Sequence, residues 1–363
     1  MALDARSLAW ATLAHKALPQ RALVTLLRAF DDPAVILDAS AATLGRHVPA
    51  AVAAAALAPV PAAELDATRR WLDDPSHHLL AWDDGDYPRA LLDIGHAPPV
   101  LFYIGVKTLL NTPAIAIVGS RMATPQGRNT ARDFANALAD AGLTIVSGLA
   151  HGVDSAAHEG ALPTAASTLA VIGTGPDRVY PARNRDLARR IAERGGIVSE
   201  FLPGTPPRKE NFPRRNRLIS GLARGVLVVE ATLSSGSLIT ARWAGEQGRD
   251  VFAIPGSIHS PFAKGCHKLI RDGAKLVETA QDVLIELGMA TDTTSAASRS
   301  PGKSAGEAPL LAAMGYDAVT VDDLVARTGL TADAVLAELV RLELDDRVSA
   351  LPGGAWQRLT PDS

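Results

Sequence analysis

Short apolar stretches alternate with helical stretches through the middle of this chain. The apolar stretches are rich in β-branched residues, and they are Ala114–Val118, Leu143–Val146, Leu169–Ile172, Ile197–Val198, Val226–Val229, Val251–Ile254 and Lys275–Val277. Helical patterns lie between most of them, for example over Gln126–Ala141 and Ser237–Gln247. Strands that are apolar on both faces and joined through helices predict an α/β fold, with a parallel sheet covered on both sides. Ligands of such sheets bind at the carboxyl ends of the strands.

The chain before this core has a helical pattern. Residues 1–75 are rich in Ala and Leu, and apolar residues at Leu23, Leu26, Leu27 and Phe30 follow the spacing of one helix face. We expect a small all-helical module there, of the SAM or helix-hairpin-helix kind. The predicted core spans residues 76–288. It opens with a proline-rich stretch, residues 78–112, that we interpret as a connector packed onto a neighbour.

The chain after the core divides into a linker and a small unit. Residues 289–308 are rich in Ser, Ala, Thr and Gly and lack periodicity, which predicts a flexible linker. In residues 309–363, two helical patterns, Val321–Thr328 and Ala332–Leu344, precede two short apolar stretches around a Pro-Gly-Gly turn. This order of elements is typical of a winged helix.

Composition excludes several classes of protein. The 363 residues predict two or three domains, and a net charge of −3 excludes a histone-like polycation. The single cysteine, Cys266, cannot form an internal disulfide or a cysteine-based zinc cluster, which fits a reducing cytoplasm. No apolar run reaches the roughly 18 residues that a membrane helix needs. We therefore expect a cytoplasmic protein without a membrane span.

Small and polar residues follow almost every predicted strand. These clusters are Gly119-Ser120-Arg121, Ser147-Gly148, Gly173-Thr174-Gly175, Ser235-Gly236-Ser237 and Pro255-Gly256-Ser257. Glycine lets backbone amides approach a ligand, and free N–H groups at a helix start attract phosphate. Together the loops predict an anion-accepting edge of the sheet. For any single loop, plain turn chemistry explains the glycine equally well.

A basic run lies late in the core. Residues 208–217 carry five cations and one anion, among them Arg214, Arg215 and Arg217 beside Phe212 and Asn216. Further arginines follow other strands, namely Arg121, Arg178, Arg183 and Arg185, with Tyr180 among them. Guanidinium groups beside an aromatic ring suit single-stranded nucleic acid, because charge holds phosphates and a ring stacks on a base. The alternative is a solvated charged face with Phe212 in the core.

Other chemistries have weak support. Gly119-Ser120-Arg121 lacks the second glycine of the dinucleotide fingerprint, and no phosphate-binding GxxxxGK[ST] loop is present. His151, Asp154 and His158 resemble a metal set only loosely, and capping or ordinary hydrogen bonding explains them better. No nucleophile elbow follows a strand. We expect no cofactor, no metal and no catalytic residue.

Longer segments of the core resemble one family. They are AIVGSR at 116–121, SGLAHGVDSAAHEGAL at 147–162, TLAVIGTGPDRVYPARN at 168–184, FPRRNRLISGLA at 212–223, VVEATLSSGSLITARWA at 228–244 and GRDVFAIPGS at 248–257. In this order they are similar to the bacterial DNA-processing protein family, DprA, also called Smf. The resemblance covers roughly residues 80–288 and implies an extended Rossmann-like fold.

The resemblance also implies a function. Its members bind single-stranded DNA at the strand ends, form homodimers, and help load the RecA recombinase past single-strand-binding protein during natural transformation; they are not known as enzymes. Carried over by motif, the DNA-binding residues would be Gly119, Ser120, Arg121, Ser147, Gly148, Arg183, Arg185, Phe212, Arg214, Arg215, Asn216, Arg217, Ser235, Gly236 and Ser237. Leu269 and Ile270 are candidates for the dimer surface. Ala182 stands where a basic residue is expected, and His267 stands where Asn is usual.

Two other functions remain as alternatives. Glu230 and the Ser235-Gly236-Ser237 loop are placed comparably to those of nucleotide-cleaving enzymes of the lysine-decarboxylase-like group, although the PGGxGTxxE motif is missing. A transcription factor would read duplex DNA with Ala332–Leu344, but the acidic side chains of that helix would repel phosphate.

Overall fold

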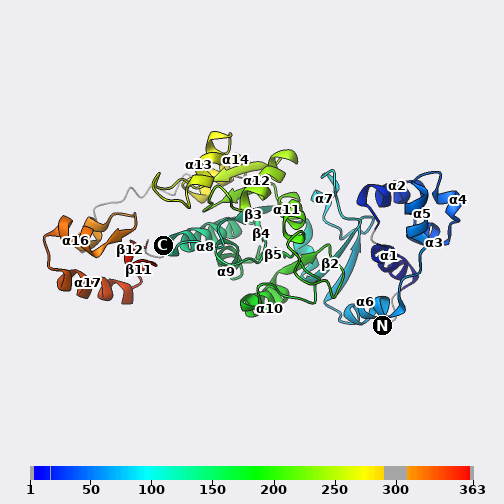
Figure 1. Ribbon diagram of the computed structural model, residues 1–363, viewed down its shortest axis with the longest axis horizontal. Coiled ribbons are helices and arrows are strands. Elements are labelled where there is room, and N and C mark those ends of the chain that lie inside the picture. Colours follow the sequence, from blue (N-terminus) through cyan, green and yellow to red (C-terminus); the bar gives the residue numbers. More distant parts are fainter. Residues whose placement is uncertain (1–3, 17, 290–308, 360–363) are drawn as a thin grey trace.

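The structure is a computed structural model that describes residues 4–16, 18–289 and 309–359. A nine-stranded sheet and its helices form the middle of the molecule, with the N-terminal helices at one end and a small C-terminal unit at the other (Figure 1). The predicted linker, residues 289–308, lies outside the described residues except for Met289.

The central sheet is mostly parallel, as the alternating pattern predicts. Its strands are β1 His77–Ala81, β2 Val100–Gly105, β3 Ala114–Val118, β4 Thr144–Ser147, β5 Thr168–Val171, β6 Gly196–Ser199, β7 Gly225–Val228, β8 Asp250–Ala253 and β9 Lys275–Leu276. They lie in the order β1-β2-β6-β5-β4-β3-β7-β8-β9. The pairs from β6 to β9 are parallel, whereas β2 joins β6 and β1 joins β2 in antiparallel fashion. The proline-rich connector therefore contributes two strands, which its pattern does not predict.

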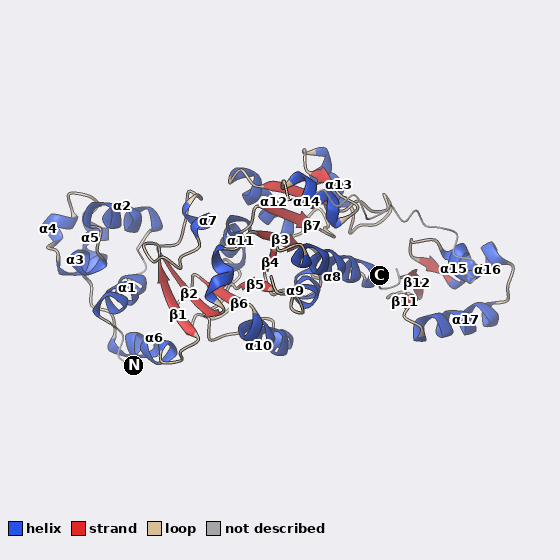
Figure 2. Cartoon of the chain, turned by 180° about the vertical axis from the view of Figure 1, so that it is seen from behind, coloured by secondary structure: helices blue, strands red, loops and turns tan. Residues whose placement is uncertain are grey.

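Helices cover both faces of this sheet (Figures 1 and 2). On one face lie α8 Pro125–Asp140, α9 Val153–Ala161, α10 Arg185–Arg194 and α14 Ala280–Glu286; on the other lie α7 Arg89–Leu92, α11 Asn211–Leu222, α12 Ser237–Glu246 and α13 Lys264–Arg271. Successive residues of β3 alternate between them: Ile115 and Ile117 pack toward α8 and α9, and Ala116 and Val118 pack toward α11. This double cover buries the middle of the sheet and leaves the loops at the strand ends accessible to solvent.

The N-terminal helices share a core with the end of the sheet. They are α1 Ala5–His15, α2 Gln20–Phe30, α3 Pro33–Asp38, α4 Ala41–Leu44, α5 Ala50–Leu57 and α6 Ala62–Leu72. Trp10, Leu13 and Leu26 are fully buried in one cluster with Phe102 of β2. Among the described residues, no single helix is long and apolar enough to cross a membrane; α5 and α6 reach that length only as a pair bent by 65°.

The C-terminal unit has the predicted winged-helix order. It comprises α15 Pro309–Met314, β10 Val319–Thr320, α16 Val321–Thr328, α17 Ala332–Leu344, β11 Val348–Ala350 and β12 Ala355–Arg358. The strands form an antiparallel sheet in the order β10-β12-β11. Leu311, Leu324 and Leu339 are fully buried in a cluster of its own. Thr331 caps α17 by accepting a hydrogen bond from the Ala334 amide.

Candidate nucleic-acid interface

The parallel strands β3 to β8 end at one edge of the sheet, so their loops are neighbours. The loop after β3 is held by Glu230, which follows β7. The Glu230 carboxylate accepts hydrogen bonds from the Thr124 amide at 2.9 Å and the Thr124 hydroxyl at 2.7 Å. Its carbonyl accepts the Ser120 amide at 2.6 Å. Because both carboxylate oxygens bind Thr124, this glutamate fixes the loop after β3 against the end of β7.

The loop after β4 is organised around two buried groups of opposite charge, Asp154 and Arg215. Asp154 accepts the Gly148 amide at 3.1 Å and the Ala150 amide at 3.3 Å. Arg215 of α11 is only 4% exposed; it donates to the Gly148 carbonyl at 2.6 Å and also to the Val171 carbonyl. Burial raises the pKa of Asp154, and burial, opposed by Asp154, lowers the pKa of Arg215 to about 10. Arg215 therefore joins the ends of β4 and β5 from inside.

These contacts correct two expectations. Arg215 is not a countercharge on the edge, because its guanidinium is enclosed and already bound to carbonyls. The amides of Ser120 and Gly148 are not free for phosphate, since they bind Glu230 and Asp154. Gly148 serves packing instead: a Cβ there would lie 2.6 Å from an Arg215 nitrogen. Side-chain cations must supply the charge at this edge.

His158 is a structural histidine. Its Nε2 accepts the Leu149 amide at 3.3 Å, so its Nδ1–H donates to the Thr168 hydroxyl at 2.7 Å, which in turn donates to the Ile145 carbonyl. Burial, together with nearby Arg215, lowers the pKa of His158 to about 3. The ring is thus neutral and has no free lone pair. Within the described ranges, no group of three His, Cys, Asp or Glu side chains could hold a metal ion.

Exposed aromatic and cationic groups meet beyond these buried contacts. The Arg121 guanidinium lies 5.8 Å from the centre of the Phe212 ring, and the Tyr180 ring centre lies 5.4 Å from that of Phe212. Arg121 is exposed and Tyr180 is 47% exposed. Phe212 is half-buried and rests on Gly173, where a Cβ would come within 2.9 Å of the ring. A cation beside two accessible rings is suited to a phosphate and a stacked base.

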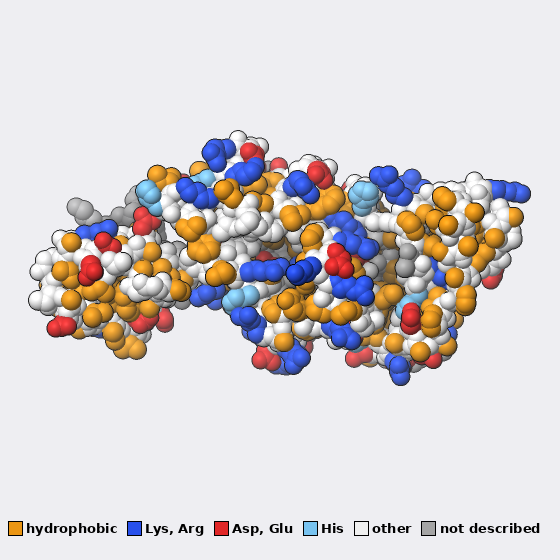
Figure 3. Space-filling model, viewed as in Figure 1, with side chains coloured by type: hydrophobic (Ala, Val, Ile, Leu, Met, Phe, Trp, Pro, Cys, Tyr) orange, Lys and Arg blue, Asp and Glu red, His pale blue; other side chains and the backbone are white. Residues whose placement is uncertain are grey.

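Further cations flank this cluster. Arg183 and Arg185 are exposed in the loop and helix start after β5. Asn184 between them donates to the Leu149 carbonyl at 2.9 Å and the Ser155 hydroxyl at 3.0 Å, which fixes this turn against the loop after β4. The pKa of His151 is lowered by burial and then by Arg183 and Arg128, so the cations of the turn after β5 and of the start of α8 both lie near this ring. Figure 3 shows cationic side chains in a band across the middle of the molecule.

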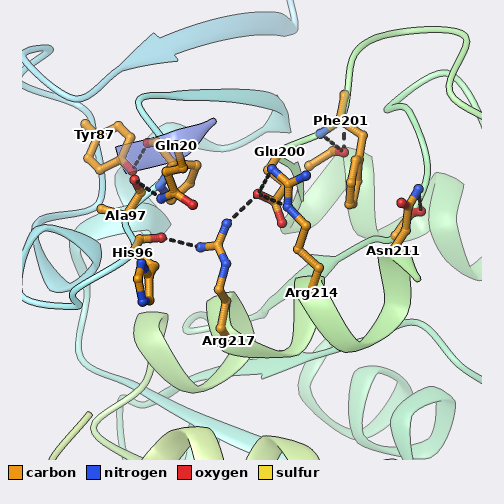
Figure 4. A network of polar contacts seen from close by, with 12 residues as sticks. Gln20, Tyr87, His96, Ala97, Glu200, Phe201, Asn211, Arg214 and Arg217 are labelled. Carbon is orange, nitrogen blue, oxygen red and sulfur yellow. Dashed lines mark hydrogen bonds and ion pairs between the residues drawn. The ribbon is translucent and has the colours of Figure 1, made fainter. Parts of the chain in front are cut away.

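Arg214 and Arg217 of the basic run share Glu200, which follows β6 (Figure 4). Arg217 is 4% exposed; it pairs with Glu200 and donates to the His96 carbonyl at 2.6 Å. It thus points toward the segment before β2, which corrects the expectation of a free countercharge. Arg214 reaches Glu200 at 3.0 Å, but its side chain is 57% exposed. Of these two arginines, only Arg214 is accessible to a ligand in the folded protein.

The other residues predicted to bind DNA are engaged in hydrogen bonds within the protein. Asn216 donates to the Gly236 carbonyl at 3.3 Å, and the Ser235 and Ser237 hydroxyls lie 2.7 Å apart at the start of α12. The side chain of Asn216 thus binds the turn that follows β7, and the two serines of that turn bind each other. Ser147 is fully buried and donates to the Ile117 carbonyl at 2.6 Å.

The α13 residues lie apart from this edge. Leu269 and Ile270 are half-buried against the main core, so their predicted dimer role stays a prediction. The His267 Nε2 lies 3.0 Å from the Gly256 carbonyl oxygen, which ties α13 to the loop after β8.

A cavity of about 1020 Å³ lies between the loops after β3, β7 and β8 on one side and the C-terminal unit on the other. Its lining includes Glu230, Glu278 and Asp317, with Arg327 as a cation. Arg327 already donates to the Ala313 carbonyl at 3.0 Å. An acidic lining repels phosphate, so the cavity is not the nucleic-acid site.

Comparison with known proteins agrees with this arrangement. The family described as DNA recombination-mediator protein A matches residues 78–288, and the DprA winged helix domain matches residues 294–354. Protein Smf of Escherichia coli is 42% identical over 302 residues, which cover 81% of each chain. The X-ray structure of DNA processing protein A from Streptococcus pneumoniae superposes with a TM-score of 0.69 at 39% identity, covering 79% of this chain and 99% of that one.

A second solved structure is that of the Helicobacter pylori DNA processing protein A, reported for its single-stranded DNA binding mode. It has a TM-score of 0.53 at 32% identity and covers 58% of this chain and 95% of that one. The matched segments include the loops after β3, β4, β5 and β7 that form the edge described above. This chain therefore belongs to the DprA/Smf family of bacterial DNA processing proteins.

Proposed function

We propose that this protein binds single-stranded DNA at the cationic rim, which we define as Arg121, Tyr180, Arg183, Arg185, Phe212 and Arg214. The observation that carries the proposal is the packing of exposed Arg121 and Tyr180 around Phe212 at the strand ends. A mobile single strand offers both groups that such a site can hold, phosphates and unpaired bases. The H. pylori relative, studied for its single-stranded DNA binding, supports the same ligand class.

The inward-facing residues have a supporting role in this proposal. Gly119, Ser120, Ser147, Gly148 and the Ser235-Gly236-Ser237 turn shape the loops, while the four exposed arginines of the cationic rim supply charge. Arg215, Asn216 and Arg217 hold α11, and with it Phe212, against the sheet edge. Binding rather than catalysis is the activity that these groups support.

The proposal gives a measurable salt dependence. If each of the four exposed arginines neutralises one phosphate, the slope of log affinity against log salt is about −3 for a single strand. Arg121→Ala should reduce the slope by about 0.7 and weaken binding of all sequences similarly. Fluorescence anisotropy with labelled oligo-dT over a salt series measures both.

A matched control is Arg189→Ala. Arg189 is exposed on α10 but pairs with Glu193 at 3.0 Å, so its loss should leave slope and affinity unchanged. Equal binding of Arg121→Ala and the parent protein at low salt would refute the site.

Family membership extends the proposal to recombination. We infer that the protein works in the cytoplasm as a homodimer through α13 and loads RecA onto single strands covered by single-strand-binding protein. RecA ATPase activity on such covered DNA should start sooner with the protein present and not with Arg121→Ala. Sedimentation of Leu269→Asp tests the dimer separately, because that variant keeps the cationic rim.

A further inference from the structure

Three of the four most exposed large hydrophobic side chains in the described part of the chain lie at one sheet edge. Met122 is 78% exposed after β3, Leu233 is 63% exposed after β7, and Ile258 is 66% exposed after β8. These strands are consecutive in the sheet. Large apolar side chains scattered singly on a surface need no explanation, but three on adjoining loops of one sheet edge call for one.

The three loops are joined by backbone hydrogen bonds. The Ser120 amide donates to the Glu230 carbonyl at 2.6 Å, which links the loops after β3 and β7. The Ala231 amide donates to the Phe262 carbonyl at 2.7 Å, which links the loops after β7 and β8. The Met122 amide donates to the Ser120 hydroxyl at 3.0 Å. The loops that carry Met122, Leu233 and Ile258 are therefore joined to one another, and we call these three side chains the apolar strip.

The apolar strip continues the cationic rim. Met122 follows Arg121 directly, and Arg121 lies over Phe212. A ligand that reaches both surfaces needs negative charge on one side and flat apolar faces on the other. We propose that the apolar strip contacts the base faces of the same single strand whose phosphates the cationic rim holds. The proposal rests on the proposed function and extends its site from β5 across β3 and β7 to β8.

The chemistry of the strip defines what it recognises. Methionine, leucine and isoleucine side chains offer no strong donor or acceptor to base edges, so they contact every base alike. They gain by covering apolar surface, which a strand without bases cannot provide. The strip therefore makes binding independent of sequence but dependent on the presence of bases. A protein partner on this surface is the competing occupant, and it predicts no such dependence.

Oligonucleotides with and without bases test the proposal. The full chain is titrated with oligo-dT and with an abasic oligonucleotide of equal length and charge. We expect the parent protein to prefer oligo-dT by about tenfold or more. The triple variant Met122→Ser, Leu233→Ser, Ile258→Ser should lower this preference several-fold while its salt slope stays that of the parent. All three side chains are exposed, so the substitutions leave the core intact.

A control variant carries Val35→Ser and Ile285→Ser, which are exposed on α3 and α14 and should leave the preference unchanged. If the triple variant prefers oligo-dT over the abasic oligonucleotide as strongly as the parent protein does, the proposal that the apolar strip contacts bases is wrong. Equal binding of both oligonucleotides by the parent protein also overturns the strip, although single-stranded binding then stands. If neither oligonucleotide binds, the proposed function is wrong and the strip falls with it.

Discussion

Replacing Arg215 by methionine tests whether this residue stabilises the strand ends or contacts DNA directly. Methionine keeps much of the side-chain volume but removes the donors to the Gly148 and Val171 carbonyls and leaves Asp154 without its cation. Removing one of two interacting buried charges costs about 3–5 kcal/mol, because the remaining charge stays in a poorly solvated place. This is a large part of the roughly 5–15 kcal/mol that stabilises an ordinary domain.

Hydrogen exchange measures this loss where it arises. The amides of β4 and β5 should open with a free energy lower by about 3–5 kcal/mol in Arg215→Met. The double variant with Asp154→Asn should recover part of the loss, because its buried side chain is neutral and still accepts the Gly148 and Ala150 amides. Whatever protein stays folded should keep the parent's salt slope, since Arg215 is enclosed. Unchanged exchange together with a smaller salt slope would show that Arg215 faces the DNA, and the reasoning would be wrong.

Two further variants test the buried histidine and the aromatic ring. Because the pKa of His158 is about 3 in the folded protein and about 6.5 when unfolded, the unfolded chain binds the extra proton as pH falls. The free energy of unfolding that depends on the neutral ring is fully present well above pH 6.5, and about 2 kcal/mol of it is lost between pH 7 and 5. His158→Gln should therefore show a smaller loss of unfolding free energy over this pH range than the parent protein. Equal losses in the two proteins would contradict the assignment of a neutral buried ring. Gly173→Ala places a Cβ 2.9 Å from the Phe212 ring, so the ring must shift and oligo-dT affinity should fall. Gly245→Ala, with open space at its Cβ, is the control, and equal affinity of the two variants would disprove the role of Phe212.

Much of the fold follows from local patterns. Strands apolar on both faces and alternating with helices predict a covered parallel sheet, and the strand ends must then share one edge. The pattern does not predict the two antiparallel strands β1 and β2, because prolines surround them and β2 joins the sheet by pairing with β6, about a hundred residues later in the chain. Family membership follows from the long motifs of the core, which the comparisons confirm.

The roles of the individual arginines depend on how α11 sits on the sheet. Neighbours on a helix point about 100° apart, so Arg214 and Arg215 cannot share a direction, whereas Arg214 and Arg217, three residues apart, both reach Glu200. The same spacing turns Phe212 and Arg215 together toward the strand ends. Assigning a helix to residues 211–222 would have predicted these pairs from the sequence.

Local sequence patterns are enough to predict the parallel part of the sheet, its glycine-bearing loops and the surplus of positive charge near their ends. Each of these depends on residues close together along the chain. Which cations remain in water and which are enclosed depends on the packing of distant segments, because these bring the carboxylates and carbonyls that bind a guanidinium. The loops that carry Met122, Leu233 and Ile258 are likewise far apart in the sequence, and hydrogen bonds between them bring them together in the fold.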